Sequence, residues 1–365
     1  MAKCYYCDFN SYAGKGDVGK DTYLTFLEKE SIIYNIKYLK MEAISLYIGG
    51  GTPTCLTDKQ LMKLFNILSS NLKFANDIEI TIEGNPGTLD MKKLAISKGF
   101  GCNRLSLGVQ SFSARDLQIL GRIHTVQDVY NTFKMARGLG FNNINLDLMY
   151  GLPGQDIQGW KENLKKIVEL QPEHISLYQL NIEKNTAFFK LYKRGLLEEF
   201  EQDVAFLMYD EAINYLSANG YRHYEISNFA KKGRESYHNK IYWRNEEYLG
   251  LGAGAASYLD SNRYTNMSSL DDYQCALDGG ELPIKKTEVI NKKLSMAETM
   301  FLGLRLLEGV KKSDFIKKHG ISVEIQYKNA IGKLKEQGLL CETPTHISLS
   351  KKGLYVANVV FCEFL

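Results

Sequence analysis

The sequence predicts a parallel α/β fold, either a barrel or a doubly wound sheet, and three observations lead to this class. Short β-branched runs alternate with longer amphipathic ones between residues 43 and 182. Each gap between two such runs has room for one helix, as a right-handed crossover requires. Polar and Gly-rich residues gather where these runs end. Together these features favour successive βα units.

Five strands are expected in this region: Ser45 to Ile48, Ile78 to Ile82, Arg104 to Leu107, Ile144 to Leu148 and Ile175 to Leu180. The helices between them include Lys59 to Leu72, Val126 to Leu139 and Gln158 to Leu170. The carboxyl ends of parallel strands share one face of the sheet. We therefore expect one ligand pocket, formed by the segments that follow the strands: Gly49 to Thr52, Glu83 to Pro86, Gly108 to Gln110, and Asp147.

The pattern loosens from about residue 185 to 285. A long helix, Phe200 to Asn219, precedes a Gly- and Tyr-rich stretch, Tyr221 to Asn266. This stretch is expected to close the sheet and cover the pocket.

The C-terminal part has a different pattern. It predicts three helices and then two short strands, which is typical of a winged-helix-like domain. A linker at Leu282 to Asn291 should precede them. The helices are Leu294 to Leu307, Lys311 to Lys318 and Ile325 to Gln337, and the strands are Leu339 to Cys341 and Ile347 to Leu349.

Composition excludes several classes. Of the 365 residues, 44% are hydrophobic and 24% charged, which are ordinary globular values and exclude disorder of the whole chain. The net charge of +3 is too small to imply an extended nucleic-acid-binding surface. No apolar run approaches about 18 residues, and Met1 to Cys4 lack the features of a signal peptide. A cytoplasmic protein that is not embedded in a membrane is expected.

The seven cysteines are scattered and odd in number, so a disulfide framework is not expected. Cys4 and Cys7 form a C-x2-C, a spacing at which two thiolates can wrap one metal centre. A redox pair and two incidental cysteines are the alternatives, and the motif alone does not decide among them.

A Gly-rich turn, Gly49 to Thr54, follows a strand and precedes a helix. It has neither the ending of a P-loop nor the G-x-G-x-x-G spacing. Three consecutive glycines exceed what a tight turn needs, which favours close approach of a ligand to the backbone.

Four side chains should surround the same pocket: Glu83, Gln110, Arg122 and Asp147. A guanidinium pairs with a carboxylate, and acidic groups accept hydrogen bonds from an ammonium or from sugar hydroxyls. The set suits a zwitterionic, ribose-bearing ligand, although each residue by itself could be a surface or capping residue.

The segment Tyr237 to Trp243 combines His238 with Tyr and Trp, and a Gly-rich run follows it. A lone histidine is more often a hydrogen-bonded core residue than a ligand. One flanked by aromatic rings could bind a planar iron macrocycle through its neutral nitrogen.

These motifs together resemble the radical SAM proteins related to oxygen-independent coproporphyrinogen III dehydrogenase. Within that group the sequence is more similar to heme chaperones of the HemW type, because Phe9 stands where the dehydrogenases carry a fourth cysteine and a His-Asn-x-x-Tyr-Trp segment is present. The likeness covers nearly the whole chain. It rests on five segments: Cys4 to Phe9, Gly49 to Thr54, Ser106 to Phe112, Asp147 to Gly154 and His238 to Trp243.

The resemblance implies a partial (β/α)6 TIM-type radical SAM barrel, a 4Fe-4S cluster and S-adenosylmethionine. It divides the chain into a radical SAM core (1–185), a barrel completion that carries the His-Asn-x-x-Tyr-Trp segment (186–285) and the winged-helix-like domain (290–365). It assigns Cys4 and Cys7 to the cluster and His238 to heme. By position it assigns nine residues to S-adenosylmethionine: Tyr6, Gly50, Gly51, Thr52, Glu83, Gln110, Arg122, Asp147 and Asn181.

One feature departs from the family pattern, which is C-x3-C-x2-C. Cys4 and Cys7 match its second and third cysteines, and the first cysteine and the strand that opens the barrel would lie ahead of Met1. We therefore expect the sequence as written to hold the cluster poorly, and to leave the strand at Ser45 without a neighbour on one side.

Three functions follow from these observations. The leading expectation is a heme-binding chaperone that delivers heme to respiratory membrane proteins. The second is oxidative decarboxylation of coproporphyrinogen III. The third is nucleic-acid binding through the winged helix, ranked last because Glu324 and Glu336 flank its lysines.

Overall fold

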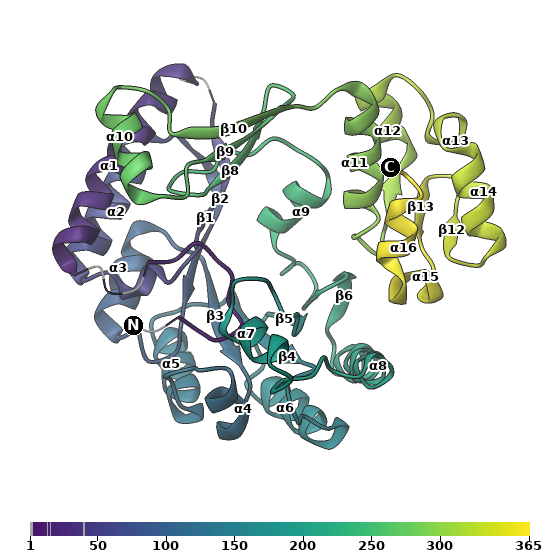
Figure 1. The fold of residues 1–365 in the computed structure, drawn as a ribbon, viewed down its shortest axis with the longest axis horizontal. Coiled ribbons are helices and arrows are strands. Elements are labelled where there is room, and N and C mark those ends of the chain that lie inside the picture. The colour runs from purple at the N-terminus through teal and green to yellow at the C-terminus, as the bar shows by residue number, and fades with distance from the viewer. Residues whose placement is uncertain (1–2, 13, 15, 39–40) are drawn as a thin grey trace.

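The computed structural model describes residues 3–12, 14, 16–38 and 41–365. Met1 and Ala2, with which the segment inspected for a signal peptide begins, lie outside the described residues. The described chain is organised around one large sheet, with a smaller sheet beside it and a separate C-terminal helical region (Figure 1).

The large sheet has seven strands in the order β1-β2-β3-β4-β5-β7-β6 within the described residues. Strands β1 to β5 are parallel, and β7 and β6 continue the sheet in antiparallel pairing. β1 lies at an edge, as expected for the strand at Ser45. The bounds are Ala43–Ile48, Phe74–Gly84, Arg104–Gln110, Ile144–Tyr150, His174–Gln179, Arg222–Glu225 and Asn228–Ala230 for β1 to β7.

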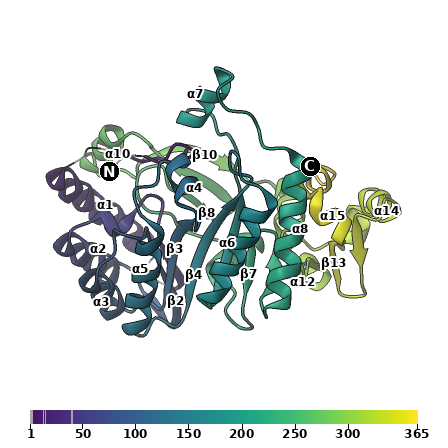
Figure 2. The same cartoon turned by 90° about the horizontal axis from the view of Figure 1, so that it is seen from below.

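Helices that follow the parallel strands cover one face of this sheet, which we call the outer face (Figure 2). Their apolar sides bury residues such as Leu64, Phe133 and Ile167 against the strands. The prediction of βα units is therefore confirmed. The helices are α2 (Asp58–Asn71), α3 (Met91–Phe100), α5 (Val126–Gly138), α6 (Ile157–Glu169) and α8 (Gln202–Ala218), with short α4 (Ala114–Ile119) and α7 (Ala187–Lys193) in the connections.

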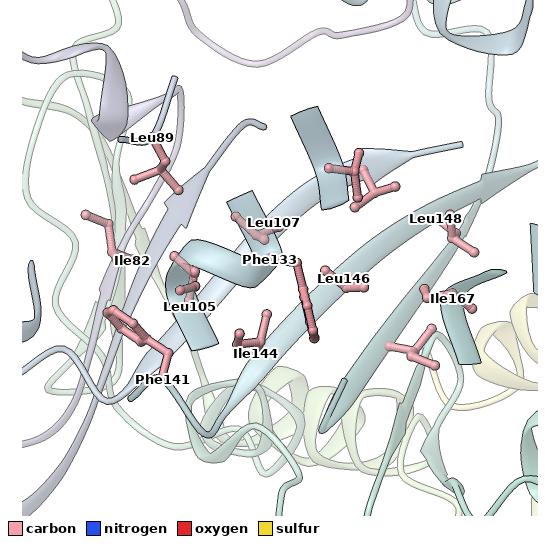
Figure 3. Packing of buried hydrophobic residues seen from close by; sticks show 14 of the residues in the cluster. Ile82, Leu89, Leu105, Leu107, Phe133, Phe141, Ile144, Leu146, Leu148 and Ile167 are labelled. Carbon is pink, nitrogen blue, oxygen red and sulfur yellow. The ribbon is translucent and has the colours of Figure 1, made fainter. Parts of the chain in front are cut away.

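The two faces of the sheet differ in chemistry because side chains alternate along a strand. Leu105 and Leu107 of β3 point into the outer core, together with Leu146 of β4 (Figure 3). Ser106 and Asn145 alternate with them and belong to the opposite face, where the Asn145 amide donates to the Ser106 hydroxyl at 2.8 Å. We call this polar side of the sheet the inner face.

A second, three-stranded antiparallel sheet stands beside the N-terminal helix α1 (Asp17–Lys37). It contains β8 (Ala256–Leu259), β9 (Asn262–Asn266) and β10 (Ile284–Val289), and α10 (Leu270–Asp278) packs on α1. The prediction of a linker at Leu282 to Asn291 is wrong, because most of that segment is β10, paired with β9. The exposed lysines of this segment are typical of a loop. The segment is extended because it pairs with β9, which lies about 20 residues earlier in the chain.

The C-terminal region has its own core around Met300, Phe315 and Ile347. The wing contains a third strand, β11, so its order is β11-β13-β12. The predicted helix Ile325 to Gln337 is broken at Tyr327, whose ring packs edge-on against Phe315 and Phe364. The elements are α11 (Lys292–Gly303), β11 (Val310–Lys311), α12 (Lys312–His319), α13 (Val323–Gln326), α14 (Lys328–Glu336), β12 (Leu340–Glu342), β13 (His346–Leu349), α15 (Lys351–Tyr355) and α16 (Ala357–Cys362).

Helix α9 (Tyr237–Trp243) contacts both β1 and α11, so it lies between the large sheet and the C-terminal region (Figure 1). The Ser236 hydroxyl caps its first turn by accepting from the Asn239 amide. The carboxylate of Glu79 on β2 accepts from the backbone amides of Tyr237 and His238 at 3.1 and 2.9 Å. These bonds fix the His238 segment above the middle of β2.

Candidate binding site on the inner face

Polar residues converge where the parallel strands end, as the sequence predicts. Glu83 is near the end of β2, Gln110 ends β3 and Asp147 is in the middle of β4. The Gly49 to Thr52 turn follows β1 and precedes the short 3-10 helix Pro53–Cys55. These segments, distant in the chain, thus share one end of the inner face.

The Gly-rich turn is packed closely at one position only. A Cβ on Gly49 would lie 2.7 Å from Cδ of Glu83 and 2.8 Å from the ring of Tyr47, so a side chain cannot fit there. Gly50 has φ +88°, which favours glycine, while Gly51 faces open space. The open positions of the turn are therefore Gly50 and Gly51, where a ligand can approach the backbone closely.

Two carboxyl groups lie in this region. Glu83 accepts from the Tyr47 hydroxyl at 2.7 Å, and Asp147 accepts from the Asn145 amide at 2.8 Å. Burial raises the pKa of Glu83 to about 7, with a further contribution from the charge of Asp147. Burial also raises the pKa of Asp147. A cationic ligand would stabilise the charged forms of both groups.

Arg122 connects three segments of the site. Its Nη2 donates to Asn85 Oδ1 at 2.6 Å and to the Gly108 carbonyl at 2.7 Å, and its Nη1 donates to Cys4 Sγ at 3.4 Å. Asn85 in turn donates to the Thr52 hydroxyl at 3.0 Å. The cysteine segment, the Gly-rich turn and the ends of β2 and β3 are joined through this one guanidinium.

Gln110 lies above the same strand end. A Cβ on Gly108 would lie 2.9 Å from Gln110 Nε2 and 3.4 Å from Arg122 Nη2, so the two side chains meet over Gly108. Gln110 has a backbone φ of +65°, a conformation that residues other than glycine rarely adopt and that is frequent at functional sites.

The Cys4 to Cys7 segment forms a turn in which the Cys7 amide donates to the Cys4 carbonyl at 3.3 Å. Tyr5 anchors it, because its amide donates to the Leu120 carbonyl and its carbonyl accepts from the Phe188 amide. Tyr6 packs with the cluster that contains Leu120, and burial raises its pKa. Burial also raises the pKa of the Cys7 thiol.

The fit of an iron-sulfur cluster can be tested on these residues. In the described part of the chain, no group of three or more His, Cys, Asp or Glu side chains is arranged to hold a metal. Two thiols close together are present, but a cluster bound only through these two would lack a ligand. The residues described here therefore do not form a complete cluster site.

Asn181 is the one predicted residue that stays apart from the others. It follows the end of β5 and is exposed, and among the described residues no hydrogen bond joins it to the site. The loose sequence pattern after β5 gave little to place it by.

His238 lies on the inner face, held from two sides. Its Nδ1 is 2.9 Å from the Ser45 hydroxyl and its Nε2 is 3.2 Å from the Tyr242 hydroxyl. The ring is stacked on Tyr47, with centroids 5.0 Å apart. Burial lowers the pKa of His238 to about 4, with the charge of Arg104 as a second cause, so the imidazole is neutral at pH 7.

Sequence reasoning gave no individual role to four residues that hold this arrangement together: Ser45, Tyr47, Asn85 and Asn145. Ser45 and Tyr47 alternate with apolar residues along β1, so the period of two along this strand could have assigned them to the inner face. Asn85 sits in the polar segment after β2. The asparagine of β4 carried no signal of its own.

The half-barrel and its polar strand ends are features of radical SAM proteins. The chain matches the family described as the Radical SAM superfamily over residues 1–167 and the HemN C-terminal domain over residues 290–356. The solved structure of coproporphyrinogen III oxidase HemN from Escherichia coli superposes with a TM-score of 0.86 at 23% identity, covering 99% of this chain and 86% of that one. This likeness shows the fold, and confirms the expected fold class.

Curated relatives define the family more narrowly. The chain is 39% identical to the heme chaperone HemW of Bacillus subtilis, over 99% of this chain and 96% of that protein. It is 34% identical to the heme chaperone HemW of Escherichia coli, over 100% of this chain and 95% of that protein. The chain belongs to the HemW family of heme chaperones.

No helix that the structure describes is both long and apolar enough to cross a bilayer.

Proposed function

We propose that this protein is a heme chaperone: it binds heme and transfers it to an acceptor protein. The observation that carries the proposal is the similarity, along the whole chain, to proteins named heme chaperone HemW. The likeness to HemN supports only the fold, because the identity there is 23%. Decarboxylation of coproporphyrinogen III is therefore the alternative to be excluded by experiment.

His238 is the candidate axial ligand of the heme iron. An imidazole coordinates through a neutral nitrogen, and burial keeps this one neutral. If Nδ1 carries the proton and donates to Ser45, Nε2 has a free lone pair, and iron would replace the Tyr242 hydroxyl as its partner. Tyr47, stacked on the imidazole, and Tyr242, edge-on to it, would supply aromatic contacts near the bound macrocycle.

S-adenosylmethionine is proposed beside this histidine on the inner face, where the parallel strands end. Glu83 and Asp147 suit its ammonium and ribose hydroxyls, and Arg122 suits its carboxylate. The open turn at Gly50 and Gly51 admits it close to the backbone. The proposed set is Tyr6, Gly50, Gly51, Thr52, Glu83, Gln110, Arg122, Asp147 and Asn181. Membership in the radical SAM superfamily implies a 4Fe-4S cluster, toward which Cys4 and Cys7 would contribute thiolates.

The acceptors proposed are respiratory membrane proteins that require heme, with the chaperone itself in the cytoplasm. The functional division proposed is a radical SAM core at 1–185, a barrel completion with the His238 segment at 186–285 and a winged-helix-like domain at 290–365. The chain carries nearly balanced charge, 45 basic against 42 acidic residues, so nucleic acid is not among the proposed partners.

A titration with hemin tests the proposal. We expect saturable binding with one Soret band, and His238→Ala should weaken binding and shift that band. His346→Ala, on the wing strand β13, is the matched control and should behave like the unaltered chain. An unaltered chain that binds no hemin would contradict the chaperone function. Conversion of coproporphyrinogen III at about 1 per second or faster would favour the dehydrogenase.

A further inference from the structure

Arg104 is a buried guanidinium for which the structure offers no partner. It is the first residue of β3 and is 2% exposed. Its side chain makes no hydrogen bond or ion pair with the described residues, and its Nε is enclosed without an acceptor. Leaving a buried charge unpaired costs several kcal/mol, so native proteins rarely do so without a function.

Three carboxylates of the strands around Arg104 are already engaged elsewhere. Glu83 accepts from Tyr47, Asp147 from Asn145, and Glu79 from the backbone amides at the start of α9. None of them lies within 4.0 Å of the guanidinium, although its charge lowers the pKa of both Glu83 and Asp147. The positive charge of Arg104 is therefore felt across the inner face but is not neutralised by a contact.

Two neighbours of Arg104 also have a buried polar atom without a hydrogen-bond partner among the described residues. Thr81 pairs with it in register on β2, is fully buried, and has a hydroxyl without a partner. Asn143 lies just before β4, where its carbonyl accepts from the Leu105 amide, and its Oδ1 also lacks a partner. Oxygen and nitrogen of such an amide exchange places by rotation of the group. Guanidinium, hydroxyl and amide together form a set of donors suited to an anion.

We infer that Arg104, with Thr81 and Asn143, binds a carboxylate of a ligand held on the inner face. A planar guanidinium can form two parallel hydrogen bonds with a carboxylate, which gives geometric selectivity as well as affinity. The inference rests on the proposed function, whose two ligands both carry such a group: heme through its propionates and S-adenosylmethionine through its amino-acid end.

The register relates this anion site to His238. Tyr47, Thr81 and Arg104 lie in one row across β1, β2 and β3, with neighbouring strands about 5 Å apart. His238 stacks on Tyr47 at one end of this row. A macrocycle bound to His238 could therefore direct a propionate along the row to Arg104. The end of β3 that holds Gln110 is six residues, or about 20 Å, from Arg104.

The test compares each ligand with a form that lacks the carboxylate. Affinities of hemin, hemin dimethyl ester, S-adenosylmethionine and its decarboxylated form are measured for the unaltered chain, Arg104→Met and Arg104→Lys. The exposed Arg194→Met on the surface serves as the control. We expect Arg104→Met to weaken the binding of hemin about ten-fold or more and to leave the affinity for the dimethyl ester unchanged. Arg104→Lys should lie between, because it keeps charge but loses the planar fork.

The outcomes separate the two ligands and the two proposals. If Arg104→Met selectively weakened the binding of S-adenosylmethionine and not that of hemin, the proposed carboxylate site would be upheld and assigned to S-adenosylmethionine. If each ligand bound the unaltered chain and the two Arg104 variants with the same affinity, the role of Arg104 would be overturned. Hemin binding by the unaltered chain would in that case still uphold the proposed function. Failure of the unaltered chain to bind any of them would overturn both. Thermal unfolding without ligand adds a check: Arg104→Met should be at least as stable as the unaltered chain.

Discussion

The imidazole of His238 is stacked on the ring of Tyr47, with centroids 5.0 Å apart and planes inclined by 24°. The hydroxyl of the same tyrosine donates to Glu83 at 2.7 Å. One side chain of β1 thus contacts both the candidate heme ligand and the candidate S-adenosylmethionine site. The two candidate sites therefore share a single aromatic side chain.

Ser45→Ala should weaken heme binding by about ten-fold, because Ser45 orients the ring of His238 and outer partners of this kind affect metal affinity by that order. Hemin titration followed in the Soret region measures it. Ser70→Ala, exposed on α2, is the matched control. Equal affinity for the Ser45 and Ser70 variants would show that the hydroxyl does not position the imidazole.

Glu83→Gln should change the pH dependence of stability. The pKa of Glu83 is about 7 in the folded chain, above the ordinary 4.5, so the folded state holds this proton more tightly than the unfolded state. Its ionisation therefore lowers stability as pH rises from about 4.5 to about 7. A glutamine at this position does not ionise, so the variant should not lose stability in this way as pH rises. We expect the difference in Tm, variant minus unaltered chain, to increase between pH 5 and pH 8, whereas a constant difference would contradict the raised pKa.

Gly49→Ala should destabilise the chain by about 1–3 kcal/mol, because its Cβ would overlap Glu83 and Tyr47. Displacement of Glu83 should also weaken the binding of S-adenosylmethionine. Urea unfolding and calorimetric titration measure the two effects. Gly99→Ala in α3 is the control, since nothing lies within 4 Å of its Cβ position. If both alanine variants behave alike, the close packing of the turn is not what the structure indicates.

Glu30→Ala should lower the free energy of unfolding by about 3 kcal/mol or more. Glu30 is fully buried in α1 and accepts from the Tyr273 hydroxyl, the Asn266 amide and the Gly252 backbone amide at 2.6 to 2.7 Å. Its loss leaves the Tyr273 hydroxyl and the Gly252 amide without an acceptor and removes one of the two acceptors of the Asn266 amide. Asp21→Ala, exposed on the same helix, should have little effect in the same urea titration. Equal losses in the two variants would argue against the role of this network.

Much of the fold could be predicted because the relevant signals are local. Alternating apolar runs identified β1 to β5, and amphipathic spacing identified α2, α5, α6 and α8. Most bounds were close to the observed ones, but β2 begins four residues before the predicted Ile78. Helix α1 was missed because its buried side includes Glu30 and Ser31, which interrupt the apolar spacing. Strand β10 was taken for a linker because its partner, β9, lies outside the local sequence.

The candidate site could be predicted in part for the same reason. Residues at strand ends, such as Glu83 and Gln110, converge by the topology of any parallel sheet, so the pattern of strands was enough to bring them together. The contact of Arg122 with Cys4 crosses from one loop to another and follows from no spacing. Asn181 shows the converse, because a position matched by resemblance alone did not bring its side chain to the others.

The sequence by itself determined the class of fold, the order of its strands along the chain, and the residue types available at their ends, because hydrophobic period and turn chemistry act over a few residues. Only the tertiary structure decided which groups meet. It stacked His238 on Tyr47 and left Arg104 buried without a partner among the residues that the structure describes. Such encounters depend on strand register and helix placement, which are set by packing of the whole chain.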